Sequence, residues 1–153
     1  MAARQSPKIE KYMRLTSFFP ILIFTLSCGT TKNVVTKTKQ LDGTWIPVKQ
    51  EIGGGSLPAP AFQKQRLIIQ DSAYTVIAES IDKGIVRYSN AKMDIYGKDG
   101  VNAGKHLTAI YKKENNRLTI CYNLSGDKYP ESFATKGKPR YFLSIFKRAS
   151  ANK

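Results

Sequence analysis

The sequence predicts a single all-β domain behind an N-terminal export signal. From Leu41 onward, short runs rich in β-branched and aromatic residues alternate with turn residues at spacings of about 8–12, which is typical of a β-sandwich or β-barrel. No long run shows a convincing helical period. The 153 residues, 41% of them hydrophobic, suffice for one domain with an ordinary core. We therefore expect a small antiparallel β domain of about eight strands, either a sandwich or a barrel.

Turn-forming residues divide this domain into its expected strands. Asn and Asp tolerate left-handed backbone conformations, so turns are expected at residues 70–72, 82–84 and 114–116. The segment from Pro58 to Gln65 is expected to form one helical turn that caps an open end, after a flexible Gly-rich loop. The predicted strands are residues 43–52, 65–70, 73–79, 84–89, 92–96, 105–113, 117–123 and 140–147.

Two strands carry further information. The last strand, residues 140–148, is apolar on both faces, so both faces should be covered. Pro47 removes an amide donor from the first strand, which predicts an edge or a bulge there.

Residues 1–27 have the composition of a secretory signal peptide. A basic segment precedes 13 mostly apolar residues, LTSFFPILIFTLS, which is short for a membrane span of about 20. Met13 is an alternative start, because a complete short signal begins there. The run ends at Ser27-Cys28, which resembles a bacterial lipobox, although Thr25 stands where Leu is usual. The alternatives are an ordinary signal peptide with an incidental Cys and an uncleaved anchor.

The lipobox resemblance implies that Cys28 is acylated and anchors the protein in a membrane. Residues 28–40 would then be a flexible tether whose lysines lie near the lipid surface. No Asp follows Cys28, which by resemblance to bacterial sorting rules implies the cell envelope, at the outer membrane facing the periplasm. With Cys28 acylated, Cys121 has no partner for a disulfide.

The net charge of +14 is spread along the chain. Residues 41–148 keep +7 once the signal, the tether lysines and Lys153 are set aside. Such a domain attracts anionic partners at long range. No basic run interleaves with a stacking platform, so we expect no nucleic-acid binding.

Trp45 and Arg148 stand at the two ends of the predicted domain. A Gly43-Thr44-Trp45 start with a late Arg resembles the lipocalin group of small barrels. The resemblance implies a small antiparallel up-and-down, lipocalin-like barrel of about eight strands. It also implies that Trp45 plugs the base and that Arg148 packs over its ring. Such a cation–π contact contributes about 0.5–2 kcal/mol.

Several segments also resemble a small bacterial domain family first described in planctomycetes. The similarity covers about residues 41–148, with departures at Pro47 and Tyr129. The family has no established activity, so it implies a fold and leaves the function open. The segments that carry it are LDGTW at 41–45, LTICY at 118–122, PESF at 130–133 and IFKR at 145–148.

The sequence indicates no familiar catalytic or metal centre. His106 is the one histidine, and no Cys or carboxylate cluster stands at ligand spacing from it. A Cys121 nucleophile with His106 as its base is a minor alternative, because Cys is among the most buried residue types. Asp94 and Asp99 offer a weak cation site. We therefore expect no catalytic residues, no metal and no cofactor.

The tyrosines suggest a binding function. Tyr74, Tyr88, Tyr111 and Tyr122 fall on separate predicted strands, and inward-facing tyrosines suit a small amphipathic ligand. The alternative is that they simply fill the core. We expect a non-catalytic, membrane-tethered domain that binds a small apolar or amphipathic ligand or an envelope partner. Its rivals are a ligand-free structural module, and an enzyme or enzyme inhibitor that acts through loops 53–64 and 124–138. The ligand, the oligomeric state and the true start codon stay open, and residues 149–153 are expected to form a disordered tail.

Overall fold

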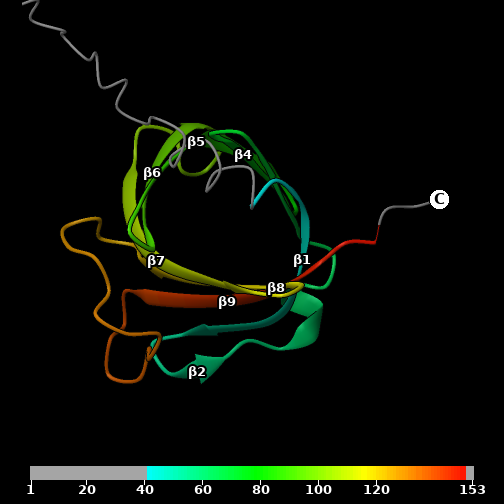
Figure 1. The fold of residues 1–153 in the computed structure, drawn as a ribbon. Coiled ribbons are helices and arrows are strands. Elements are labelled where there is room, and N and C mark those ends of the chain that lie inside the picture. The colour runs from blue at the N-terminus through cyan, green and yellow to red at the C-terminus, as the bar shows by residue number, and fades with distance from the viewer. Residues whose placement is uncertain (1–40, 151–153) are drawn as a thin grey trace, which may run out of the picture.

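One antiparallel sheet of nine strands makes up the computed structural model, which describes residues 41–150 (Figure 1). Its elements are β1 (Gly43–Ile52), β2 (Gly55–Ser56), the 3-10 helix η1 (Ala59–Ala61), β3 (Arg66–Gln70), β4 (Ala73–Ile77), β5 (Ile81–Ser89), β6 (Lys92–Asp99), β7 (His106–Glu114), β8 (Arg117–Asn123) and β9 (Tyr141–Arg148).

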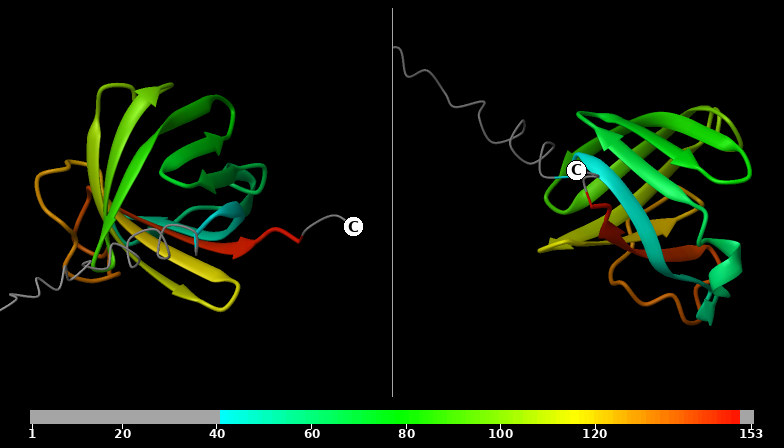
Figure 2. Two further views of the ribbon diagram at one scale, coloured as in Figure 1. Left: turned by 45° about the horizontal axis from the view of Figure 1, so that its top comes forward. Right: turned by 90° about the vertical axis from the view of Figure 1, so that its right-hand side faces the viewer.

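The sheet closes on itself into a barrel. Strands β3 to β8 each pair with the next strand along the chain, and β1 pairs with both β3 and β9. The two residues of β2 pair only with the end of β1. The remaining eight strands form a closed up-and-down barrel, which confirms the predicted fold class (Figures 1 and 2).

Strand β1 leaves β3 soon after it begins. Residues 43–45 pair with β3, whereas the rest of β1 pairs with β9 and β2. The ladder between β1 and β9 shifts register between Pro47 and Lys49, which confirms the irregularity predicted at Pro47. Because β1 and β3 pair at one end only, the barrel wall is open at the other end.

The turn expected at residues 82–84 is wrong. These residues lie inside β5, and the chain reverses at residues 78–80, where the Ala78 amide donates to the Ser80 carbonyl at 3.0 Å. Asp82 is a common turn residue, yet its side chain is buried in the barrel, where hydrogen bonds satisfy it. Strands β1 and β8 have the predicted bounds, and the ends of the other strands differ from the prediction by at most three residues.

The main core fills the inside of the barrel at the end where residue 41 enters. Trp45 and Leu41 are buried there, and the Trp45 Nε1 donates to the Leu41 carbonyl at 2.7 Å. Alternate residues of the other strands complete this core, because successive side chains of a strand point to opposite faces. Its other buried members are Leu67, Ile69, Tyr74, Val86, Met93, Ile95, Leu107, Ala109, Leu118, Ile120 and Phe146.

A second, smaller core lies on the outside of the barrel. The segment of residues 124–140 crosses the outer face of β7, β8 and β9 (Figure 1, orange). Cys121, Tyr141 and Leu143 are buried beneath it, with Ile110 and Phe133 packed beside them. This cover confirms that both faces of the last strand are buried, as its apolar pattern predicted.

Several predictions concern residues outside the described range. The signal peptide, Cys28, the tether and residues 151–153 all lie there. Residues 149–150, at the start of the expected tail, follow β9 without regular structure. Within residues 41–150, no helix is long and apolar enough to cross a membrane.

Candidate ligand site

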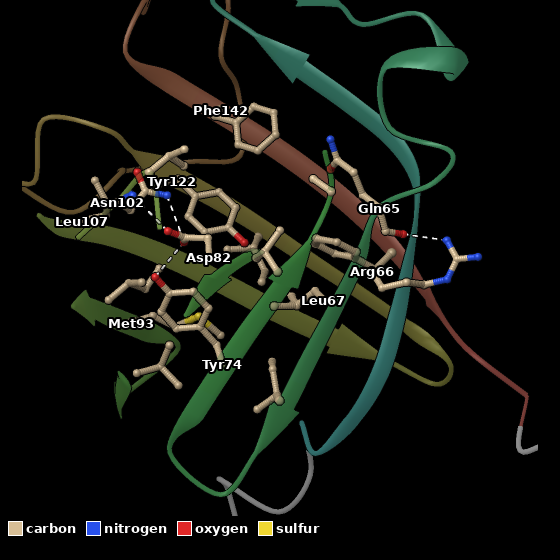
Figure 3. Close-up of a pocket in the computed structure, with 18 of the residues that line it drawn as sticks. Gln65, Arg66, Leu67, Tyr74, Asp82, Met93, Asn102, Leu107, Tyr122 and Phe142 are labelled. Carbon is tan, nitrogen blue, oxygen red and sulfur yellow. Dashed lines mark hydrogen bonds between the residues drawn. The ribbon is translucent and has the colours of Figure 1, made fainter. Parts of the chain in front are cut away.

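A cavity of about 250 Å³ occupies the barrel interior and opens where β1 and β3 separate (Figure 3). Its lining is mostly apolar, and the polar groups gather toward the opening. The lining residues are Gln50, Gln65, Arg66, Leu67, Ile69, Tyr74, Val76, Ala78, Ser80, Asp82, Val86, Met93, Ile95, Val101, Asn102, Leu107, Ile120, Tyr122, Leu124, Phe142 and Phe146.

Trp45 lies at the opposite end of the barrel. Its ring is fully buried, and the Arg148 guanidinium carbon lies 4.8 Å from the ring centre. Strand pairing places the two residues opposite each other on β1 and β9. The contact has the geometry that the lipocalin resemblance implied, while its contribution to barrel closure stays a prediction. Trp45 is not part of the cavity lining.

The four candidate tyrosines all point into the barrel, but only two of them line the cavity. Tyr74 and Tyr122 do so, from β4 and β8. Tyr88 and Tyr111 instead pack against the core, with their rings edge to face at a centroid distance of 5.8 Å. The Tyr88 hydroxyl is buried and makes no hydrogen bond with the described residues. The cavity therefore uses half of the predicted set.

Asp82 is the centre of a polar cluster that the sequence analysis missed. Its Oδ2 accepts hydrogen bonds from the Tyr74 hydroxyl and from the Asn102 Nδ2, both at 3.0 Å. Its Oδ1 accepts one from the Asn102 backbone amide at 2.9 Å. Asp82 is 5% exposed, and this cluster forms the wall of the cavity near its mouth. The alternation that places Tyr88 inside also places Asp82 inside, but the turn predicted at 82–84 hid it.

The loop that carries Asn102 fits tightly against the strand ends. A Cβ atom at Gly97 would lie 1.7 Å from the Asn102 carbonyl oxygen, so a larger residue has no room there. Gly100 has a φ of +87° and approaches the backbone of Ile81 and Asp82. Two glycines and one buried carboxylate therefore fix the β6–β7 loop at the mouth.

A second polar group lies across the mouth from Asp82. The Gln50 Nε2 donates to the Gln65 Oε1 at 2.9 Å and to the Ser144 Oγ at 3.4 Å. Alternation counted from the buried Trp45 would point Gln50 outward. Gln50 is nevertheless buried, because the irregularity after Pro47 changes which residues of β1 point inward. Strict alternation along β1 therefore does not predict that Gln50 points into the barrel.

The Gly-rich loop does not cover the opening. None of residues 53–64 lines the cavity, so only Gln65 of the segment 58–65, which was expected to cap the open end, reaches it. A Cβ atom at Gly54 would lie 2.8 Å from the Lys136 Cα, so the loop packs against the outer segment of residues 124–140. The Gly54 amide donates to the Thr135 Oγ1 at 3.0 Å. The predicted helical turn exists as η1, beside this loop.

Burial keeps the interior tyrosines protonated at neutral pH. It is the main cause that raises the pKa of Tyr74 and of Tyr122 well above the usual range. The bond to Asp82 raises the pKa of Tyr74 further. The Tyr122 hydroxyl makes no hydrogen bond with the described residues, so it is available to a ligand in the cavity.

Cys121 and His106 do not meet. Cys121 is fully buried in the outer core and pairs with Ile110, whereas His106 lies four residues earlier on β7. Burial raises the pKa of the Cys121 thiol to about 11, so it is a poor nucleophile at neutral pH. The His106 Nε2 lies 2.8 Å from Asp94 Oδ1 on the outer wall, and the ring stacks on Tyr96.

Metal binding and similarity to known proteins are two further sources of information on a site. In the part of the chain that the structure describes, no three His, Cys, Asp or Glu side chains gather as a metal site requires. Comparisons with protein-family models, curated proteins and solved structures found no match for the chain.

Proposed function

We propose that this protein is a lipid-anchored envelope protein whose barrel binds one small apolar or amphipathic molecule without chemical conversion. The observation that carries the proposal is the open interior of the barrel. A fully packed barrel of this size leaves no room for a ligand, whereas an eight-stranded barrel can also hold one. Here apolar side chains surround a cavity that reaches the surface.

The cavity volume limits the size of the ligand. A dry protein cavity of about 150 Å³ holds one benzene molecule. The present cavity of about 250 Å³ therefore suits a molecule of roughly ten non-hydrogen atoms. The apolar lining supplies the affinity, and the few polar groups at the mouth orient the ligand.

The polar cluster at the mouth favours binding over catalysis. All three hydrogen bonds of Asp82 come from the protein itself, so this carboxylate braces the mouth. Cys121 is buried outside the barrel, and His106 lies on the outer wall. None of these groups is arranged as a nucleophile with its base inside the cavity.

The sequence alone supports the anchor. A short apolar run that ends at Ser27-Cys28 matches a lipoprotein signal, and attached acyl chains hold such a protein at a membrane. The proposed location is the periplasmic face of the outer membrane. The barrel agrees with the resemblance to the planctomycete-type family and to the lipocalin group. We propose that the protein is related to these barrels.

The test is a titration with 1-naphthylamine, a dye of about the size that fits the cavity, which is uncharged at neutral pH and whose fluorescence changes in apolar sites. We expect saturable binding of one dye per chain. Val76 lines the cavity and Ile77 points outward on the same strand, so V76F should weaken binding and I77F should not. Circular dichroism checks that both variants are folded. Absence of saturable binding, or equal binding by both variants, would favour the ligand-free structural module.

A further inference from the structure

Two charged side chains border the cavity, and only one of them contributes its charge to the interior. Asp82 belongs to the wall and is almost fully buried. The Arg66 guanidinium turns away from it, and its Nη1 donates to the backbone carbonyls of Gln63 at 3.1 Å and Gln65 at 2.7 Å (Figure 3). The interior is therefore bordered by one carboxylate with no cation facing it.

Most hydrogen-bond donors of the lining are already used by the protein. The Gln50 Nε2 is bound to Gln65 and Ser144, and the Tyr74 hydroxyl donates to Asp82. Both amide groups of Asn102 also donate to Asp82. Among the described lining residues, a ligand that needs donors, such as a carboxylate, finds the Tyr122 and Ser80 hydroxyls and the remaining nitrogens of Arg66, whose Nη1 is held at the Gln63 and Gln65 carbonyls.

Acceptors and aromatic faces remain available. The Gln50 Oε1 and the Tyr122 Oη accept no hydrogen bond from the described residues. The rings of Tyr74, Tyr122 and Phe142 lie around the same space (Figure 3). Acceptor oxygens, a buried carboxylate and aromatic faces together form the environment that stabilises an organic cation.

We propose that the ligand is a small amphipathic amine, bound as its ammonium, and that the cavity rejects the matching carboxylate. This inference rests on the proposed function, since it assumes that the cavity is a binding site. The ammonium would lie near the mouth, between the Asp82 wall and Gln50, with the apolar part among Met93, Ile95 and the neighbouring side chains.

The surface charge of the barrel predicts the opposite preference. Residues 41–148 carry +7, and a positive surface attracts anions from solution. Salt screens that long-range attraction strongly, while a charge inside the cavity is screened much less. Measurements at physiological ionic strength therefore report mainly the effect of Asp82.

The experiment is displacement of 1-naphthylamine by octylamine, 1-octanol and octanoate, which share one tail and differ in the charge of the head. We expect affinity to fall in that order, with octylamine binding about tenfold or more tightly than octanoate. Octanoate binding as tightly as octylamine would overturn the inference and leave the proposed function in place. If the dye itself does not bind, the proposed function fails.

Two variants test the origin of the preference. D82N removes the buried charge with little change of shape and should bring octylamine and octanoate to similar affinities. D94N removes the same charge from the outer wall and should leave the preference unchanged. An unchanged preference in a folded D82N protein would contradict the role of Asp82. If D82N does not fold, the order of the three ligands on the unmodified protein still decides the inference.

Discussion

At the scale of single residues, the stack of Arg148 on Trp45 joins the first wall strand to the last. The guanidinium lies 4.8 Å from the ring centre, and the ring is fully buried. W45A should lower the free energy of unfolding by about 3–5 kcal/mol, as large aromatic truncations do. R148A should cost less, and a double-mutant cycle should show a coupling of about 0.5–2 kcal/mol. Denaturant unfolding measures all three, and additive effects of the two substitutions would contradict the coupling.

The interior tyrosines differ in how their hydroxyls are satisfied. Tyr74 donates to Asp82, whereas the buried Tyr88 hydroxyl has no hydrogen-bond partner among the described residues. Y74F should destabilise the protein by about 1–3 kcal/mol, because it leaves a buried carboxylate short of a donor. Y88F should be neutral or stabilising, because it removes an unsatisfied polar atom. Equal losses of unfolding free energy in Y74F and Y88F would contradict this difference between a satisfied and an unsatisfied hydroxyl.

At the scale of elements, the β1–β2 hairpin is fastened to the outer segment of residues 124–140. The Thr135 hydroxyl donates to the Glu51 carboxylate and accepts from the Gly54 amide. The hydrogen bond from Thr135 is the main cause that lowers the pKa of Glu51, and the neighbouring Lys49 adds to it. Replacing Thr135 by valine should therefore destabilise the protein by about 1–3 kcal/mol at neutral pH.

The pH dependence of this contact has a definite sign. A pKa that is lower in the folded state gives stability that is complete above the unfolded-state pKa of Glu51. That stability is lost as the pH falls through the lowered folded-state pKa. The difference in unfolding free energy between the unmodified protein and T135V should thus shrink in acid. In an E51Q background this pH dependence should disappear, and its persistence there would assign it to another group.

The predictability of the elements follows from the strength of each local signal. Alternation and turn residues were enough for the eight wall strands, because each of them buries at least one face. The turn at 82–84 was wrong, because a buried, hydrogen-bonded Asp followed by Lys and Gly looks like a turn in sequence. Gln50 and Asn102 were missed, since their places depend on an irregular strand and on a loop folded back by two glycines.

At the scale of the whole molecule, the first described residue and the mouth lie at opposite ends of the barrel. Residue 41 enters at the closed end, beside Trp45, while the cavity opens at the other end. A tether from Cys28 to Leu41 spans at most roughly 45 Å. The anchor is proposed to hold the closed end nearer the membrane, which leaves the mouth free to exchange its ligand.

The anchor is tested by replacing Cys28 with serine. Acyl chains contribute about 0.8 kcal/mol for each buried CH₂ group, and two or more give stable membrane binding. C28S should therefore lose metabolic labelling by a fatty-acid analogue and should leave the membrane fraction. C121S is the matched control, because this buried cysteine lies inside the barrel domain, and it should keep both properties. Labelling and membrane retention that survive in C28S would contradict the lipoprotein assignment.

We propose that a small molecule occupies the barrel interior. The methyl group of Met93 reports on that space directly. Met93 lines the cavity, and it is the one methionine after residue 40. The measurement is the NMR signal of ¹³C-methyl-labelled methionine during titration with octylamine. We predict a saturable shift of the Met93 signal that ends at one ligand per chain. A Met93 signal that stays unchanged at saturating octylamine would contradict the claim.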